Sequence, residues 1–286
     1  MSLLIILVGP PGAGKSTLAK SEYSAFTRIS QDDNGKEHMH LFQDALLRGD
    51  PILIDRMGFN RQQRDRYLIP AKAAGYETKI IVLHESRETC FARCMSRPDH
   101  PTVKNSDHAN NALNIFFSKY ERPEPGEADH IEFRYPEFSK PDAVWIDIDN
   151  TLSDASAREH FLQGERKDWK SFFDDMSEDP VNAWCKHLVN SLYWTTQILI
   201  CSGRPDSYQQ ITEDWLRTNQ VNYHRLFMRL RSDHRKDSIV KETIFDFEIK
   251  TRYNLLFSVD DRRQVIDKAR ERGILVLDCA GEKGNF

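Results

Sequence analysis

The chain has 286 residues, with 40 lysines and arginines against 44 aspartates and glutamates, which gives a formal charge of −4. This length predicts about two domains, and a composition of 39% hydrophobic and 29% charged residues is typical of a soluble globular protein. The near-balanced charge argues against a basic surface that grips long nucleic acids, but it leaves open the binding of a few nucleotides at a local patch.

No segment is predicted to cross a membrane or to direct secretion. The apolar run Leu3–Val8 is far shorter than the roughly 20 residues that a spanning helix needs, and it lacks the basic flank of a signal peptide. The five cysteines are spread thinly and do not form the dense framework of a small secreted domain. We therefore expect a cytoplasmic protein, for which an oligomer remains possible.

The first half alternates predicted strands with predicted helices. Strands are expected at Leu3–Val8, Ile52–Asp55 and Lys79–Leu83, and helices from Lys15 to about Tyr23, over Arg61–Ala74 and over Arg87–Ser96. The Pro-, His- and Asn-rich stretch Arg97–Asn111 is predicted to be a mobile loop or lid, followed by a helix near Ala112–Tyr120. Such alternation is typical of parallel βαβ units.

The second half repeats this alternation after a proline-rich segment. Four prolines lie within Arg122–Asp142, and we place the domain boundary near Lys140. Further strands are expected at Ala143–Asp147, Gln197–Ser202, Leu255–Asp260 and Ile274–Asp278, with helices between them. The predicted fold class is therefore α/β, with two doubly wound domains over residues 1–140 and 141–286.

A phosphate-binding loop follows the first predicted strand. Residues 9–16, GPPGAGKS, fit the pattern G-x-x-x-x-G-K-S/T between an apolar strand and a helix. The backbone N–H groups of such a loop close around phosphate oxygens, while the lysine reaches the β and γ phosphates and the hydroxyl ligates Mg²⁺. The candidate residues for binding the nucleotide and its metal are Gly9, Gly12, Gly14, Lys15, Ser16 and Thr17.

Candidate residues for the transfer step lie after later elements of the first half. Asp32 follows an apolar stretch that we expect to form a strand adjoining the glycine loop, and a carboxylate there could take the proton of an attacking hydroxyl. Asp55 ends a second predicted strand and could orient the metal or hold the site together. Arg93 and Arg97 are four residues apart and share one helix face. That helix enters the predicted lid, where an arginine would stabilise charge on the γ-phosphate, although a solvated helix face is an equally good interpretation.

The second half carries a D-x-D-x-T motif at the end of its first predicted strand. Asp147 and Asp149 are two residues apart, so their side chains emerge on the same side of the strand. One carboxylate can attack phosphorus to form an acyl phosphate, while the other handles the proton of the leaving group and then activates water. Such a site needs Mg²⁺ to gather the two anions.

Partners for this motif follow in order along the chain. Ser202, at the end of a predicted strand, is suited to hold the transferred phosphate. Lys241 is a candidate to offset charge on the nucleophile, and Asp260 and Asp261 supply strand-end acids for Mg²⁺. Their order along the chain predicts an aspartyl-phosphate site.

Both constellations together resemble the bifunctional polynucleotide kinase-phosphatases of T-even phages, in which a P-loop 5′-kinase domain precedes a haloacid-dehalogenase-type 3′-phosphatase domain. The resemblance covers nearly the whole chain. It includes Asp32-Asp33, the pair Arg93 and Arg97, Arg158, Ser202-Gly203-Arg204, the runs Asp233–Asp237 and Val240–Glu242, and Val259–Arg262.

The resemblance implies a role for each matched residue. In the first domain Asp32 would be the general base toward a 5′-hydroxyl and Arg97 would stabilise the γ-phosphate of ATP, with Arg93 and Asp55 in support. In the second, Asp147 would be the nucleophile and Asp149 the acid/base. The residues expected to frame substrate and phosphate are Arg158, Ser202, Arg204, Arg229, Asp237 and Lys241, and those expected to serve the metal are Asp147, Asp149, Asp260 and Asp261.

Two positions depart from this family. Gly35 stands where the family carries an arginine that would grip the 3′-phosphate of the substrate, so either Lys36, Arg56 or another cation takes over, or recognition of the acceptor differs. Asn150 stands where glycine is more usual, a change that leaves the carboxylates intact.

The leading hypothesis is an enzyme that phosphorylates 5′-hydroxyl ends and dephosphorylates 3′-phosphate ends of RNA or DNA before a separate ligase acts. Two alternatives stay open: a small-metabolite kinase fused to a small-molecule phosphatase, and a nucleotide-gated switch that transfers no phosphate. Spacing does not reveal which nucleic acid is preferred, because reading a 2′-hydroxyl depends on pocket geometry.

Overall fold

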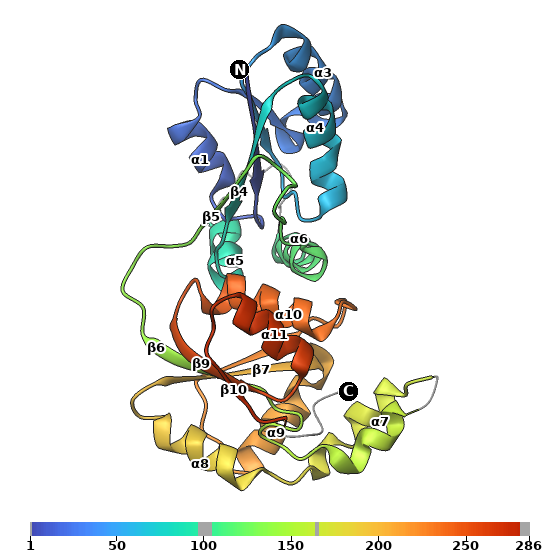
Figure 1. The fold of residues 1–286 in the computed structure, drawn as a ribbon, viewed down its shortest axis with the longest axis vertical. Helices are drawn as coiled ribbons and strands as arrows, with labels where there is room; N and C mark the ends of the chain where they lie inside the picture. Colours follow the sequence, from blue (N-terminus) through green and yellow to red (C-terminus); the bar gives the residue numbers. More distant parts are fainter. Residues whose placement is uncertain (1, 97–104, 164–165, 281–286) are drawn as a thin grey trace. The chain divides into compact units, whose positions relative to one another are not determined.

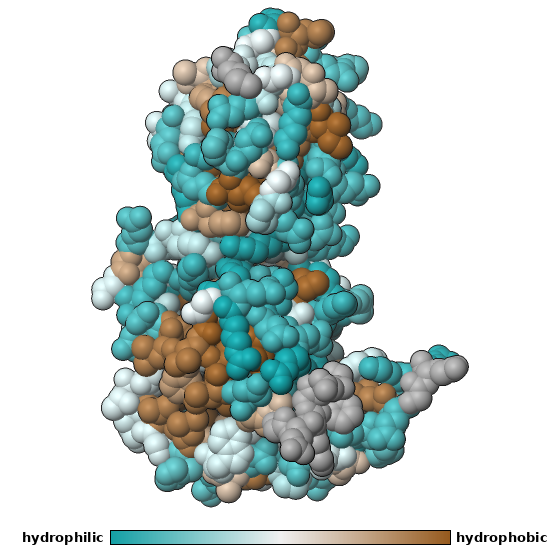
Figure 2. Space-filling model, viewed as in Figure 1, coloured by the Kyte–Doolittle hydropathy of each residue, from teal (hydrophilic) through white to brown (hydrophobic). Residues whose placement is uncertain are grey.

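A computed structural model describes residues 2–96, 105–163 and 166–280 of the chain. The chain divides into two compact units, which we call unit 1 (Met1–Glu137) and unit 2 (Phe138–Phe286). Each unit contains a five-stranded parallel sheet, which confirms the predicted α/β class with two doubly wound domains (Figure 1). The face drawn in Figure 2 is mostly hydrophilic, as the charged composition predicts. Among the described residues, no helix is both long and apolar enough to cross a membrane.

Unit 1 has the strand order β2-β3-β1-β4-β5. Its strands are β1 (Leu3–Val8), β2 (Thr27–Ser30), β3 (Ile52–Asp55), β4 (Glu77–Leu83) and β5 (His130–Arg134). Its helices are α1 (Lys15–Glu22), α2 (Gln31–Asn34), α3 (His38–Arg48), α4 (Arg61–Ala73), α5 (Arg87–Met95) and α6 (Ser106–Lys119), with a 3₁₀ turn η1 (Gly35–Glu37). Helix α1 covers one face of the sheet, and α3 and α4 cover the other (Figure 1).

The central strand β1 explains why this sheet forms. Its residues from Leu4 to Val8 are all buried, as expected for a strand covered on both faces. Ile5 and Leu7 point to the same side and pack against Leu18 of α1. The continuous apolar run therefore places the glycine loop that follows β1 at the carboxyl edge of the sheet.

Unit 2 has the strand order β10-β9-β6-β7-β8. Its strands are β6 (Asp142–Ile146), β7 (Gln197–Pro205), β8 (Arg225–Arg229), β9 (Asn254–Asp260) and β10 (Val276–Asp278). Its helices are α7 (Trp169–Asp174), α8 (Ala183–Leu192), α9 (Gln209–Thr218), α10 (Asp237–Ile244) and α11 (Arg263–Glu271). Shorter turns are η2 (Ser156–Leu162), η3 (Met176–Glu178), η4 (Asp206–Tyr208) and the π-helical η5 (Phe245–Ile249).

The alternation along β6 divides the core of unit 2 into two layers. Val144 and Ile146 join one buried cluster with residues of α8 and α9. Trp145 joins another with Phe245, on the opposite face. Figure 1 shows α8 and α9 on one side of this sheet and α10 and α11 on the other. The arrangement leaves the carboxyl ends of the strands open for polar side chains.

One predicted loop is wrong over part of its length. The stretch Arg97–Asn111 was expected to be a loop, but α6 already begins at Ser106. The side chain of Asn105 accepts a hydrogen bond from the backbone N–H of His108 at 2.9 Å and caps this helix. Ala109 is fully buried and packs against Cys94. Burial of one helix face thus overrides the polar composition, while residues 97–104 lie outside the described part of the chain.

Two edge strands have no counterpart in the sequence prediction. Strand β5 lies inside the proline-rich segment before the domain boundary and pairs with β4. Strand β8 pairs with β7, and its side chains are exposed or half-buried. Edge strands bury less side-chain surface than central strands, so their sequences lack the apolar run by which the others were recognised.

A buried ion pair ties the end of unit 1 to its helix α4. The guanidinium of Arg64 contacts the Glu127 carboxylate through two nitrogens, at 2.5 and 3.1 Å, and donates to the carbonyl oxygens of Gly58 and Glu121. The side chains of Arg64 and Glu127 are each only 1% exposed. Both charges of the pair are therefore buried away from water, and each is satisfied by partners within unit 1.

We predict that Glu127→Ala lowers the free energy of unfolding of unit 1 by roughly 3–5 kcal/mol, because it leaves the Arg64 charge buried and unpaired. All five tryptophans belong to unit 2. Tryptophan fluorescence reports the unfolding of unit 2 alone, so the urea midpoint measured by fluorescence should stay unchanged. Far-ultraviolet circular dichroism reports both units, and its transition for unit 1 should move to a lower urea concentration.

Asp65→Ala is the matched control on the same helix. Asp65 is half-buried and forms a pair at 3.5 Å with the exposed Arg61, and surface pairs contribute roughly 0.2–1 kcal/mol. Equal destabilisation by the two substitutions would contradict the prediction.

Candidate active sites

The register of unit 1 brings three strand ends together beside the glycine loop. Leu7 of β1 pairs with Asp55 of β3, and Asp55 pairs with Ser30 of β2. Strand β3 thus separates β2 from β1, which corrects the expectation that Asp32 follows a strand adjoining the glycine loop. Asp32 instead lies in the first turn of α2. The order of the strands nevertheless places their carboxyl ends along one edge.

The glycine loop has the backbone that its sequence predicts. Gly12 and Gly14 have φ values of 84° and 97°, in the left-handed region that favours glycine. A Cβ at Gly12 would lie 2.4 Å from the carbonyl oxygen of Cys90. The Lys15 ammonium donates to the carbonyl oxygens of Gly9 and Pro10, each at 2.8 Å. Burial lowers the pKa of Lys15, although the nearby Asp55 opposes this shift.

A cavity of about 650 Å³ opens in front of this loop. Ser16 also lines it, whereas Thr17 is exposed in the first turn of α1. Asp32 faces the same cavity, and its carboxylate makes no hydrogen bond or ion pair with any described residue. The volume is in the range of pockets that hold small ligands and cofactors. The cavity therefore joins a phosphate cradle to an accessible carboxylate.

Asp55 is held by a cation that the sequence did not single out. Arg28 Nε and Nη2 donate to the same Asp55 oxygen at 2.9 and 2.6 Å. The second terminal nitrogen of Arg28 pairs with Asp33 at 2.7 Å. Asp55 is buried and lines the cavity, whereas Asp33 does not line it. Arg28 thus neutralises Asp55 and leaves Asp32 as the cavity carboxylate without such a partner among the described residues.

The structure places one of the two predicted lid arginines. Arg93 Nη1 donates to the Gly12 carbonyl oxygen at 3.3 Å, and Nη2 pairs with Glu85 at 3.0 Å. These contacts attach α5 to the glycine loop. Arg97 lies outside the described residues.

Arg56 also lines the cavity, and neighbouring side chains hold its guanidinium in place. Its Nη1 donates to the Tyr67 hydroxyl at 2.8 Å, and its Nη2 contacts the side-chain oxygen of Gln31. The side chains of Tyr67 and Gln31 are uncharged, and Arg56 forms no ion pair with another residue of the described chain. Gly35 and Lys36 line the same cavity, and a Cβ at Gly35 would meet nothing within 4 Å, although the φ of 54° at this position is one that side chains other than glycine rarely adopt. Space and positive charge thus remain where the resemblance predicts an arginine.

In unit 2 the register assembles the second site at the carboxyl end of β6. Ile146 pairs with Ile200 of β7 and with Val259 of β9. The backbone N–H of Asp147 donates to the Val259 carbonyl oxygen at 3.0 Å. Asp147 and Asp260 therefore leave neighbouring strands at the same level, and β6 lies where the sheet order reverses, the usual position of a site in such sheets.

Three carboxylates and one lysine form the centre of this site. Oxygens of Asp147, Asp260 and Asp261 lie within 4.8 Å of one another. The Lys241 ammonium contacts Asp147 at 2.6 Å and Asp260 at 2.7 Å. Burial raises the pKa of Asp147 and Asp260, although Lys241 opposes both shifts. Burial disfavours the charge of Lys241 in turn, but Asp147 and Asp260 outweigh it and raise its pKa.

The cluster also contains an oxygen that lacks a partner. Oδ1 of Asp261 is buried and makes no hydrogen bond within the described chain. Burial and the neighbouring Asp260 raise the pKa of Asp261 to about 6. Three buried carboxylate oxygens, one of them unpartnered, are a donor set suited to Mg²⁺. The Asp149 side chain is not part of this set, although we expected it to serve the metal.

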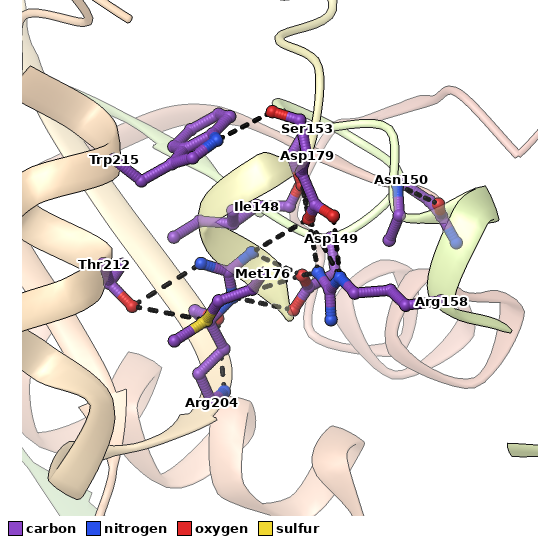
Figure 3. Close-up of polar contacts among 12 residues, drawn as sticks. Ile148, Asp149, Asn150, Ser153, Arg158, Met176, Asp179, Arg204, Thr212 and Trp215 are labelled. Carbon is purple, nitrogen blue, oxygen red and sulfur yellow. Dashed lines mark hydrogen bonds and ion pairs between the residues drawn. The ribbon is translucent and has the colours of Figure 1, made fainter. Parts of the chain in front are cut away.

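Asp149 faces two arginines instead (Figure 3). Arg204 reaches it through Nε at 3.1 Å and Nη2 at 2.6 Å, and Arg158 Nη2 contacts the same carboxylate. Burial opposes ionisation of Asp149, but Arg204 and Arg158 outweigh burial and hold its pKa well below the usual range. In this arrangement Asp149 is an ionised carboxylate.

Asp179 completes this network and was missed from the sequence. It is buried beside Asp149, and Arg158 Nε donates to it at 2.8 Å. It also lies 3.6 Å from Arg204 and accepts from the Ser153 hydroxyl at 3.2 Å. Two carboxylates thus share two arginines. Asp179 has no motif around it in the sequence, so only the fold reveals its position.

The remaining predicted residues lie around Asp237, which is 3.6 Å from the Lys241 ammonium. Ser202 is buried, and its hydroxyl accepts from the Arg204 backbone N–H at 3.2 Å. A Cβ at Gly203 would lie 2.2 Å from Oδ1 of Asp237, so glycine allows this close approach. Arg229 donates to the Gly203 carbonyl at 2.9 Å and to Asp237 at 3.1 Å. Burial opposes ionisation of Asp237, but Lys241, Arg262 and Arg229 outweigh it and lower the pKa.

The backbone explains why asparagine is accepted at position 150. Asn150 has a φ of 60°, in the left-handed region that asparagine adopts more readily than most side chains. Its amide donates to Glu159 at 2.9 Å and accepts from the Ala155 backbone N–H at 3.0 Å. The substitution therefore leaves the D-x-D turn intact.

Comparisons with known proteins agree with the geometry of unit 2. Residues 141–286 match a family described as the polynucleotide kinase PNKP phosphatase domain. A protein of the Autographa californica nuclear polyhedrosis virus, named as a bifunctional polynucleotide kinase/RNA ligase, is 25% identical over 296 residues, or 92% of this chain and 40% of the relative. Transcription factor bHLH140 of Arabidopsis thaliana is 28% identical over 202 residues, or 63% of this chain and 22% of the relative. The chain thus spans between a fifth and two fifths of these relatives.

Solved structures show lower similarity. A chain from the Pnkp1/Rnl/Hen1 RNA repair complex is 23% identical with a TM-score of 0.42, and the match covers 97% of this chain and 95% of that one. The kinase CysC of Mycobacterium tuberculosis is 17% identical with a TM-score of 0.34, over 48% and 90% of the two chains. TM-scores of this size carry no argument about function. The family match, in contrast, spans slightly more than half of the sequence, and the protein belongs to the family of the polynucleotide kinase PNKP phosphatase domain.

Proposed function

We propose that this protein heals nucleic-acid ends, by transferring phosphate from ATP to 5′-hydroxyl ends and by removing 3′-phosphate through an aspartyl-phosphate intermediate. One observation carries the proposal: a single chain combines a phosphate-binding loop facing an unpaired carboxylate with the carboxylate cluster of a polynucleotide 3′-phosphatase family. Residues 1–140 would form the kinase domain and residues 141–286 the phosphatase domain.

In the kinase reaction Asp32 would take the proton of the 5′-hydroxyl. The freed oxygen attacks the γ-phosphorus, and the bond to the β–γ bridging oxygen breaks to release ADP. Lys15 and the loop N–H groups would hold the phosphates, and Ser16 would help to hold Mg²⁺. Arg93 donates to the Gly12 carbonyl oxygen and so keeps α5 against the loop. Thr17 would support the loop and Arg97 the γ-phosphate. The accessible, unpaired state of Asp32 suits a general base.

Arg56 would bind the phosphate on the 3′ side of the acceptor nucleotide, in place of the family arginine that is absent at Gly35. Its guanidinium is fixed by Tyr67 and Gln31, so little side-chain entropy is lost when it pairs with an anion. Lys36 is exposed and has no such support among the described residues. A prepositioned arginine is therefore the better candidate of the two cations.

In the phosphatase reaction the Asp147 carboxylate would attack phosphorus while the bond to the 3′-oxygen breaks. Asp149 gives a proton to the leaving oxygen, then takes one from the water that attacks the acyl phosphate and releases inorganic phosphate. Asp149 needs a proton for the first step, so we propose that the anionic substrate competes with it for Arg158 or Arg204 and that Asp149 then takes a proton from solvent before it donates one. Ser202, Arg229 and Asp237 frame the phosphate, and Lys241 offsets charge on Asp147.

Mg²⁺ would bind to Asp147, Asp260 and Asp261, whose oxygens fit such an ion. When bound, the ion supplies positive charge between the nucleophile and the phosphate. The viral relative named as a polynucleotide kinase/RNA ligase supports RNA ends as substrates and a ligation step that follows, which this chain would leave to a separate protein.

The independence of the two sites is tested by substituting one residue in each. Asp32→Ala should reduce label transfer from γ-labelled ATP to a 5′-hydroxyl oligonucleotide by about 10²- to 10⁴-fold, the usual contribution of a general base. Release of phosphate from a 3′-phosphorylated oligonucleotide should stay unchanged. Asp147→Asn should abolish phosphate release from the 3′-phosphorylated oligonucleotide, because an amide is not a nucleophile toward phosphorus. It should leave label transfer to the 5′-hydroxyl unchanged.

Asp44→Ala is the matched control, since Asp44 is exposed on α3, does not line the cavity and forms no ion pair within the described chain. Loss of both activities on either substitution, in a chain that still folds, would show that the sites are not independent. Wild-type protein that transfers label only to a small metabolite would favour the metabolite-kinase alternative. ATP hydrolysis without any transfer would favour the nucleotide switch.

The role of Arg56 predicts a selective loss of acceptor binding. Arg56→Ala should raise the KM for a nucleoside 3′-phosphate acceptor by roughly tenfold or more, because a hydrogen bond to a charged group contributes about 1.5–3 kcal/mol. The KM for ATP and for an acceptor without a 3′-phosphate should change little. If Lys36→Ala raises the KM and Arg56→Ala does not, the lysine replaces the family arginine.

The raised pKa of Asp261 predicts a stability cost that metal removes. The pKa of Asp261 is 3.8 in the unfolded chain and about 6 in the folded one, so between these pH values Asp261 is protonated only in the folded state. The loss of folding stability caused by its buried charge is therefore fully present above pH 6 and absent below pH 4. In EDTA, Asp261→Asn should therefore melt a few degrees above wild type at pH 7, and the difference should shrink toward pH 4.

Added Mg²⁺ should raise the melting temperature of wild type more than that of the variant. Asp267→Asn, an exposed change on α11, is the control and should have little effect at either pH. A variant that is less stable than wild type at pH 7 in EDTA would refute the prediction.

A further inference from the structure

An exposed group of aromatic rings lies beside the arginine network of unit 2, and none of the proposed roles uses it. We define the aromatic surface as Trp169, Phe173 and Tyr208. We propose that the aromatic surface stacks against bases of a single-stranded polynucleotide whose 3′-phosphate occupies the Asp147 site, an inference that rests on the proposed 3′-phosphatase function.

The three rings form a continuous series. Trp169 and Phe173 are stacked, with ring centroids 5.9 Å apart and planes inclined by 25°. Phe173 and Tyr208 have centroids 5.3 Å apart. Trp169 is 42% exposed, and the other two rings are half-buried. Trp169 therefore exposes much of its side chain to solvent, and the other two rings are partly accessible.

The aromatic surface is connected to Asp149 from two sides. Phe172, between Trp169 and Phe173 in the fold, has its ring 4.1 Å from the Arg158 guanidinium carbon, and its carbonyl oxygen accepts from Arg158 at 2.9 Å. The same guanidinium contacts Asp149. On the other side, Tyr208 follows Arg204 by four residues, and Arg204 also holds Asp149. A strand whose terminal phosphate reaches the acidic cluster would thus have these rings next to it.

The chemistry of the surroundings identifies the occupant. Stacking on aromatic side chains is sequence-tolerant, because every base has a π face, and it requires bases that are free of a duplex partner. Arg166 and Lys167 are exposed just before Trp169, and the Lys167 ammonium lies 5.8 Å from the Trp169 ring centroid. Neither forms an ion pair with a carboxylate of the described chain. These cations complement the phosphates of a strand that crosses the rings.

The test compares two 3′-phosphorylated strands of equal length and charge, one with all of its bases and one whose last nucleotides are abasic, each in an RNA and a DNA form. Wild type should show the lower KM for the strand with bases. Trp169→Ala should raise that KM about tenfold, a change typical of one lost stacking contact, and should make the KM values of the two strands nearly equal. Trp169→Phe keeps a ring and should stay within about twofold of wild type.

Trp194→Ala is the matched control. Trp194 is 85% exposed, but it lies three residues before β7 begins, at the edge of the sheet opposite to the site. It should leave both KM values unchanged. Circular dichroism checks that each variant is folded.

The outcomes separate the inference from the function on which it rests. If wild type releases phosphate but Trp169→Ala does not change the KM for the strand with bases, or if Trp194→Ala raises it equally, the aromatic surface does not bind substrate. If wild type releases no phosphate from either strand, the 3′-phosphatase function itself is wrong. An effect confined to the RNA or the DNA form would identify the nucleic acid that the rings accept.

Discussion

The second site depends on the ammonium of Lys241, which lies between two buried carboxylates and offsets their charge. Parallel strands β6 and β9 end side by side, and their carboxyl ends place Asp147 and Asp260 close together in a buried position. Two carboxylates in such surroundings repel each other and resist ionisation. Lys241, delivered by α10 from outside the sheet, lies within 2.7 Å of both. Its charge offsets part of the cost of burying the two carboxylates, and Asp261 still keeps an oxygen that no described residue satisfies.

The same constraint explains the arginines around Asp149. A second carboxylate two residues from Asp147 adds negative charge to a site that already has three acids. Arg158 and Arg204 neutralise Asp149, and the fold adds Asp179 to hold both arginines in place. Each arginine of this network therefore lies between two carboxylates, those of Asp149 and Asp179. Breaking any one of these buried pairs would leave a charge without a partner, which is more costly than breaking a pair on the surface.

Unlike the candidate nucleophile of unit 2, one of the candidate carboxylates of unit 1 is left without an ion-pair partner among the described residues. Asp55 is buried and neutralised by Arg28, while Asp32 is exposed to the cavity and has no partner among the described residues. The difference matches the chemistry proposed for each unit. A general base has to accept a proton from a substrate that comes and goes, so an accessible carboxylate suits it. A nucleophile that forms a covalent intermediate is better kept in a rigid, dry pocket with its charge already balanced.

The sequence by itself determined the two α/β units, their central strands and the motif residues, because continuous apolar runs and fixed spacings such as GPPGAGKS and D-x-D are local properties of the chain. Their roles in catalysis remain predictions. Local pattern was insufficient for the beginning of α6 and for strands β5 and β8, which depend on packing against distant elements. Only the tertiary structure decided that Arg28 neutralises Asp55 and that Asp179 shares the arginines of Asp149. Those pairings join residues between 21 and 27 positions apart in the chain, and charges so separated meet only after the strands have set the register that brings them together.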